Sequence, residues 1–193
     1  AGAKVLGGFT VLTKLNPWLV GAHFVLSGFM IATAALLVFR ALPPKHIAVS
    51  QGIFKTATPI SIVGTIAVLI GVLVTGAGPH SGDAQSVRNG LDLELWQHLH
   101  SYPAYILLLL AVVQLGLLPK RDKAGLERSY QLKVSSWLLI TTIAQAIIGI
   151  AQARLGVPAG LVALHMLGAS VLCALLTFQW LAIRGKTPGN QNG

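Results

Sequence analysis

Uninterrupted apolar runs of about 20 residues dominate this chain of 193 residues, and about 20 apolar residues are what a helix needs to cross a bilayer. Strands that span membranes alternate polar and apolar residues, and these runs do not alternate. Charged residues make up only 10% of the chain, against about 25% in a soluble domain. We therefore expect an all-α integral membrane protein. A soluble globule and a disordered chain are excluded, as is a disulfide scaffold, because Cys173 has no second cysteine to pair with.

The apolar runs predict five complete transmembrane helices and a partial one. The complete spans are placed at residues 17–42, 56–77, 93–118, 133–153 and 158–183. Asn16-Pro17 and Pro158 mark helix starts, because proline is favoured in the first turn of a helix. Residues 1–13 are apolar but too short to cross alone, and we expect them to be the outgoing end of a further helix.

Basic residues are distributed unevenly between the two ends of these spans. Ten fall in the loops at 40–55 and 118–133 and in the C-terminal tail, whereas Lys14, Arg88 and Arg154 fall on the other side. Loops rich in Lys and Arg stay in the cytoplasm. We therefore expect a multi-pass protein of the plasma membrane with its C-terminus in the cytoplasm. On this interpretation the net charge of +9 reports topology and not nucleic-acid binding.

The sequence matches itself without gaps at a shift of 142 residues. At this shift residues 5–24 fall on residues 147–166, Gly7 on Gly149, and His23 on His165. The shift equals about four helices, so a complete protein of this plan has two four-helix halves with pseudo-symmetry. Halves related in this way commonly carry functional sites at equivalent positions.

The repeat divides the chain into three parts. We expect residues 1–42 to be the end of the first half, with a partial helix and one full helix. Residues 56–184 form the second four-helix half, and residues 185–193 form a cytoplasmic tail.

Three histidines, His23, His100 and His165, lie six or seven residues into helices that enter from the outer side, about 10 Å deep at 1.5 Å per residue. An imidazole inside a membrane helix is costly unless it is paired or bound to a metal. Two facing imidazoles at one depth supply the two axial nitrogens of a six-coordinate heme iron, and helix bundles commonly hold such sites. These side chains can therefore meet across a bundle core, where a facing pair of them would bind heme. The alternative is that each makes a hydrogen bond between helices.

The other histidines carry different expectations. His98 and His100 are two residues apart, about 200° around a helix, so only one of them can face a given iron. His46 lies in a basic loop and is expected to be solvated. His80 is expected at the surface of an outer loop, close enough to the outer membrane face to touch a bound group. A zinc or copper site needs three or four N, S or O ligands. The predicted spans offer no carboxylate in their cores, so heme is favoured over a non-heme metal.

Four segments, in this order and spacing, resemble the bacterial form of the heme A synthase family: NPWLVGAHF, VLVTGAGPHSGDA, LHSY and LVALHMLGA. The resemblance covers essentially the whole chain and matches the family's last five helices plus the end of the third. It implies an eight-helix membrane oxidoreductase that oxidises the C8 methyl of heme O to the formyl group of heme A, for cytochrome oxidase. The partners it implies are heme O, heme A, the lipid bilayer, heme O synthase and cytochrome oxidase assembly, without nucleic acid.

The resemblance also implies residue roles. His100 and His165 match the second-half histidine pair, which would ligate the iron of a heme b. His23 matches one histidine of the first-half pair, at the catalytic heme O site, and its partner would lie on the family's second helix. Three outer-side cations are candidate partners for heme propionates: Arg88, Arg154 and Lys14.

Two other functions fit the same residues. The first is a b-type cytochrome that carries electrons through a bis-histidine heme and performs no oxidation of its own. The second is a non-catalytic membrane subunit associated with a respiratory complex, in which the histidines serve helix packing. The heme content of the purified protein separates these possibilities.

Overall fold

The computed structural model describes residues 2–42, 51–79, 86–118 and 130–184. In these ranges six helices and no strand are present: α1 (Gly2–Leu12), α2 (Pro17–Ala41), α3 (Gln51–Ala77), α4 (Leu93–Leu117), α5 (Tyr130–Arg154) and α6 (Ala159–Arg184). The five helices α2 to α6 are long and apolar enough to cross a membrane. The prediction of an all-α membrane protein is confirmed. His46, His80, the tail at 185–193 and most of the basic loops lie outside the described residues.

Local capping explains where two of the spans begin. The side-chain oxygen of Asn16 accepts a hydrogen bond from the Trp18 backbone N–H at 3.0 Å, directly before Pro17. The Asp92 carboxylate accepts one from the Leu95 backbone N–H at 2.7 Å. Each cap satisfies a backbone donor that the helix itself leaves without a partner.

Two helices begin earlier than the sequence predicts. α3 begins at Gln51 and not at residue 56, and α5 begins at Tyr130 and not at residue 133. The predicted starts followed the edge of the apolar run, where Lys55 and Lys133 stand. The backbone continues as helix beyond that edge because the extra turns take part in the packing of the bundle.

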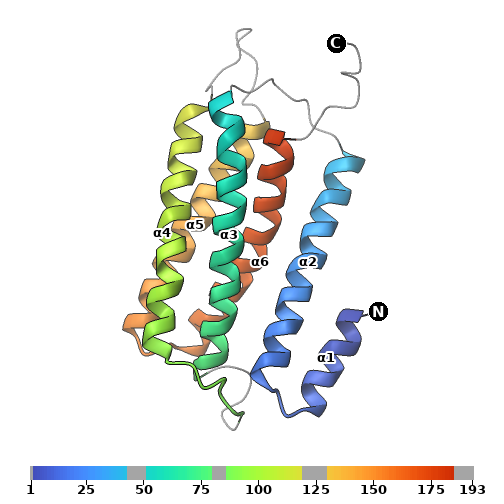
Figure 1. Ribbon diagram of the computed structural model, residues 1–193, viewed down its shortest axis with the longest axis vertical. Coiled ribbons are helices and arrows are strands. Elements are labelled where there is room, and N and C mark those ends of the chain that lie inside the picture. Colours follow the sequence, from blue (N-terminus) through green and yellow to red (C-terminus); the bar gives the residue numbers. More distant parts are fainter. Residues whose placement is uncertain (1, 43–50, 80–85, 119–129, 185–193) are drawn as a thin grey trace.

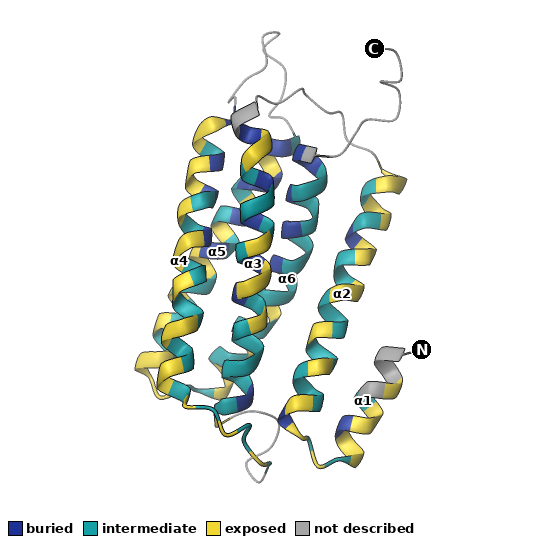
Figure 2. Cartoon of the chain, viewed as in Figure 1, coloured by how far each residue is buried: buried dark blue, intermediate teal, exposed yellow. Residues whose placement is uncertain are grey.

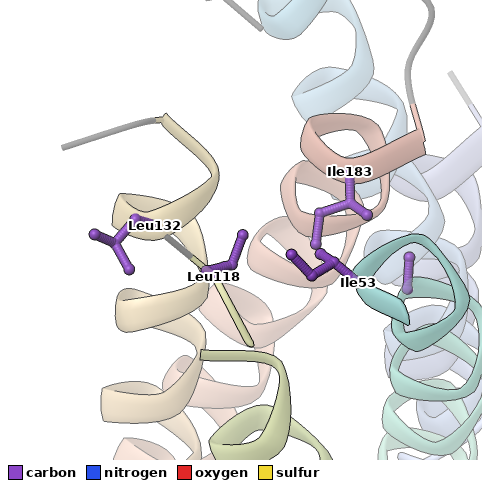
Figure 3. Packing of buried hydrophobic residues seen from close by; sticks show 5 residues of the cluster. Ile53, Leu118, Leu132 and Ile183 are labelled. Atoms are coloured by element: carbon purple, nitrogen blue, oxygen red, sulfur yellow. The ribbon is translucent and has the colours of Figure 1, made fainter. Parts of the chain in front are cut away.

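Buried side chains at this end of the bundle account for the longer helices. Ile53 and Leu132, one from each extra turn, are 3% and 6% exposed. They belong to one hydrophobic cluster with Leu118 and Ile183, shown in Figure 3. Burying such side chains contributes roughly 1.5–3 kcal/mol each, enough to hold an extra helical turn in place.

Helices α3, α4, α5 and α6 form a four-helix bundle, in which α3 and α5 each pack against both α4 and α6 (Figure 1). α2 packs outside the bundle, against α3 and α6, and α1 contacts α2 alone among the described helices. Large apolar side chains such as Phe29, Leu109 and Ile147 are exposed, where lipid would contact them. Exposed positions occur along all the helices (Figure 2).

The repeat that is visible in the sequence is also present in the backbone. The α1–α2 and α5–α6 turns carry positive φ angles at equivalent positions: Lys14 (54°), Leu15 (56°), Gly156 (73°) and Val157 (58°). The Leu15 N–H donates to the Thr10 carbonyl at 2.8 Å, and the Val157 N–H donates to the Gln152 carbonyl at 2.7 Å. Since 10 and 15 become 152 and 157 at the shift of 142, the α1–α2 hairpin is the structural counterpart of the α5–α6 hairpin.

Buried polar side chains join the four bundle helices near the end of the bundle at which α3 begins and α4 ends. Gln114 of α4 is fully buried, and its side-chain oxygen accepts hydrogen bonds from Thr56 Oγ1 and Gln179 Nε2, both at 2.9 Å. Its Nε2 donates to Ser135 Oγ at 2.8 Å. These residues come from α3, α6 and α5, so one amide connects all four helices. Such bonds stabilise helix association in lipid. Here they join the four helices at this end of the bundle.

Candidate functional site

The opposite end of the bundle contains a cavity of about 450 Å³. Its lining comes from the last turns of α3 and α5 and the first turns of α4 and α6, with Val20, Gly21 and Phe24 of α2 on one side. Most of the lining is apolar, and its polar side chains are Thr75, Gln97, His98, His100, Ser101, Tyr105, Thr142, Gln145, Gln152, Arg154 and His165. An apolar cavity with a few convergent polar groups is typical of a cofactor or small-molecule site.

Two of the predicted ligands lie together in this cavity. The His100 ring of α4 and the His165 ring of α6 have their centroids 6.1 Å apart, with their planes inclined at 79°. Both side chains are half-buried. The Nδ1 atom of each is buried without a hydrogen-bond partner among the described residues. His100 is also hydrogen-bonded to the backbone of Ala67 on α3.

A glycine of the preceding helix lies against each of these rings. A Cβ placed on Gly71 of α3 would stand 3.0 Å from His100 Cε1, and one placed on Gly149 of α5 would stand 3.5 Å from His165 Cε1. The missing side chains let each imidazole lie close to the backbone of its neighbour helix.

His23 does not join this pair. It is half-buried, and its ring packs on Gly7 of α1, where a Cβ would stand 3.3 Å from His23 Cε1. It is not among the cavity-lining residues, although Gly21 and Phe24 are. Successive residues turn by about 100° around a helix, so His23 points to α1 when those two face the bundle. His23 therefore lies apart from the His100–His165 pair and packs against α1.

The structure distinguishes His98 from His100, which the sequence could not. His98 is exposed, on the rim of the cavity, whereas His100 is half-buried and its ring faces that of His165. Among the two, His100 is the side chain that is paired with a second imidazole.

The three cations that are candidate propionate partners lie in different places. Arg88 is half-buried, and its Nη2 donates to the Pro79 carbonyl at 2.6 Å. It is not among the cavity-lining residues, whereas Arg154 lines the cavity and is exposed. Lys14 is exposed in the α1–α2 turn. Arg154 is therefore the cation at the mouth of the cavity.

Asn89 is a structural residue that the sequence analysis missed. Its Nδ2 donates to the Leu73 carbonyl at 2.8 Å, and its Oδ1 accepts from the Leu91 backbone N–H at 3.0 Å. These bonds attach the segment before α4 to the end of α3, beside the cavity. The available signal was the Asn-Gly pair at 89–90, a turn dipeptide, since Gly90 has a φ of 80°.

Gln145 and Gln152 of α5 lie in a different environment from Gln114. Hydrogen bonding between helices is what polar residues in spans usually provide, and Gln114 does so. Gln145 and Gln152 instead line the cavity, and Gln152 Oε1 is buried without a partner among the described residues. This carbonyl oxygen can accept a hydrogen bond from a bound molecule.

The donor set fits a heme better than a bare metal ion. An iron bound by one nitrogen from each of two imidazoles places the ring centroids roughly 6 Å apart, because metal–nitrogen bonds are about 2 Å long. The observed separation of His100 and His165 is 6.1 Å. Within the described residues, no group of three or more His, Cys, Asp or Glu side chains could hold a metal ion. A porphyrin needs only two ligands from the protein.

No family model, curated protein or solved structure matches this chain. The functional assignment therefore depends on the geometry of this cavity and on the motifs of the sequence.

Proposed function

We propose that this chain binds a heme b between His100 and His165 and takes part in the oxidation of heme O to heme A. The observation that supports the heme is the pair of imidazoles with centroids 6.1 Å apart in an outer-end cavity. The motif resemblance to heme A synthases supports the reaction.

The bound heme supplies redox chemistry at its iron, and the protein supplies position and environment. His100 and His165 hold the iron from two helices, each with one ring nitrogen. The apolar lining excludes water from the site. Arg154, at the mouth, attracts the anionic propionates, and the buried Gln152 oxygen accepts a hydrogen bond from a donor on the ligand.

His23 belongs to a second site in this proposal. The Gly7–His23 contact between α1 and α2 repeats the Gly149–His165 contact between α5 and α6. Equivalent positions of a repeat commonly carry equivalent sites. We therefore assign His23 to the catalytic heme O site, with a second ligand from another helix.

The proposal includes a place in the cell. The ten-to-three distribution of basic residues supports a plasma-membrane protein with a cytoplasmic C-terminus. The histidines then lie in the outer leaflet. Heme O synthase and the assembly of cytochrome oxidase are the partners that this reaction requires.

Pigment identity tests the proposal. The chain is purified from cells that make heme O, its hemes are extracted, and each heme is identified by mass. We expect heme b together with heme O or heme A. The wild type should also convert added heme O when a second ligand stands opposite His23 at the heme O site. Folded protein without heme would contradict the proposal.

A b-type electron carrier is the second candidate, because one complete histidine pair is present among the described helices and His23 is separate from it. Extraction of heme b alone, with no conversion of heme O, favours the carrier.

A further inference from the structure

We infer that Gly71 and Gly149 are positioning residues, which set where the His100 and His165 rings stand relative to each other. The inference rests on the proposed heme site. It assigns part of the orientation of each ligand to close contact with the glycine backbone of the preceding helix.

The contact recurs in each helical hairpin that carries a membrane histidine. A Cβ on Gly7, Gly71 or Gly149 would meet the ring of a histidine on the next helix, at 3.3, 3.0 and 3.5 Å respectively. In all three cases the closest ring atom is Cε1. The α3–α4 hairpin shares this contact although its connection is longer than the turns of the other two hairpins.

The glycine contact acts beside the hydrogen bonding of each ring. Histidines that bind metals almost always donate their second ring N–H to a carbonyl, carboxylate or water, which fixes the ring orientation. His100 is hydrogen-bonded to the backbone of Ala67, one helical turn before Gly71 on α3, whereas Nδ1 of His165 is buried without a partner among the described residues. Packing against the glycine backbone further restricts the rotation of each ring.

The two contacts differ in tightness. Carbon atoms in good contact are about 3.5–4.0 Å apart. A methyl group on Gly149 would meet His165 at an ordinary distance, whereas one on Gly71 would stand only 3.0 Å from His100 Cε1 and would displace the ring. Gly71 therefore determines the position of His100 more strictly than Gly149 determines that of His165.

Alanine variants of the full chain test this difference. Gly71→Ala should lower heme affinity by roughly 10- to 100-fold, the usual effect of disturbing the orientation of a metal-binding histidine. It should also change the g-anisotropy of the low-spin electron paramagnetic resonance signal. This signal depends on the angle between the two ring planes, which is 79° in the wild-type structure, and displacing His100 changes that angle. Gly149→Ala should stay close to wild type in both. Gly116→Ala is the matched control in α4, since a Cβ there meets nothing within 4 Å.

A second readout needs no heme. Deuterium exchange at histidine Cε1–H is measured by mass spectrometry on heme-free protein. Cε1 is the ring atom that lies nearest to a Cβ placed on each glycine. Gly71→Ala should speed exchange at His100 several-fold and leave His23 unchanged. If Gly71→Ala should fail to fold, Gly149→Val applies the same displacement to His165 and is expected to speed exchange there.

The two readouts separate the inference from the proposed function. Wild type without heme, combined with faster exchange in Gly71→Ala, would refute the heme proposal and retain the positioning role. Heme-loaded Gly71→Ala with wild-type affinity, spectrum and exchange would overturn the inference and leave the heme proposal intact.

Discussion

Gln114 makes three hydrogen bonds across the bundle, so replacing it with leucine should destabilise the protein strongly. The Gln114→Leu change keeps a similar volume at a position that is 0% exposed. It removes the bonds to Thr56, Gln179 and Ser135. Hydrogen bonds between membrane helices contribute about 0.6 kcal/mol each, which gives roughly 2 kcal/mol for the three.

A further cost comes from the partner that remains. Gln179 is also 0% exposed, and its Nε2 would lose its acceptor. A buried donor without an acceptor costs about 1–3 kcal/mol. The total expected loss is therefore roughly 3–5 kcal/mol, on the sum of these two terms. Thr56 is affected less, because its single hydroxyl hydrogen can donate to the Ile53 carbonyl, 2.6 Å away, in place of the Gln114 oxygen.

The double variant Gln114→Leu/Gln179→Leu provides the decisive comparison. Removing both amides eliminates the buried donor, so the double variant should be at least as stable as Gln114→Leu alone. Reversible unfolding in mixed detergent micelles, followed by circular dichroism, measures the free energies. Val112→Leu, on the lipid-facing side of α4 and 50% exposed, is the control and should change stability by less than about 0.5 kcal/mol. A Gln114→Leu protein as stable as wild type would refute the reasoning, as would additive losses in the double variant.

Three further predictions concern the site and the topology. His100→Ala or His165→Ala should abolish the low-spin heme spectrum, whereas His23→Ala should keep this spectrum and remove heme O oxidation. Loss of the b-type spectrum in His23→Ala would mean that the assignment of the heme b ligands to α4 and α6 is wrong. Asn89→Ala removes two hydrogen bonds that hold the segment before α4, and should lower the unfolding free energy by about 1–2 kcal/mol and speed proteolysis at 86–92; unchanged proteolysis would count against this role. Reporter fusions after residue 184 should be active only as cytoplasmic reporters, and an active periplasmic reporter there would reverse the assigned orientation.

Much of the fold could be predicted from the sequence because membrane spans depend on few variables. Apolar length sets the spans, and the helices α2, α4 and α6 match the predicted ranges to within a residue at each end. The starts of α3 and α5 were predicted too late. Ile53 and Leu132 pack with residues distant in sequence, and this packing is invisible to a hydropathy pattern.

The site was only partly predictable for a similar reason. Depth along a helix can be counted, which is why the sequence predicts one level for His23, His100 and His165. The direction of each side chain depends on how the helices pack, and this separates His23 from the pair and leaves His98 exposed. The choice between Arg88 and Arg154 also depends on packing, since the Arg88 guanidinium is bonded to the Pro79 carbonyl.

The glycine contacts show what the repeat could and could not indicate. The shift of 142 residues pairs Gly7 with Gly149 and His23 with His165, which marks these positions as related. It does not reveal that each glycine touches its histidine. It also gives no sign of Gly71, whose contact with His100 arises from a hairpin with a different connection.

The reduced-minus-oxidised visible spectrum of the purified full chain tests the central claim most directly, since bis-histidine ligation by His100 and His165 carries the proposed function. The account predicts a low-spin, six-coordinate b-type spectrum that survives His98→Ala and disappears in His165→Ala. A folded wild-type protein without a low-spin heme spectrum, or a spectrum that His165→Ala leaves unchanged, would contradict it.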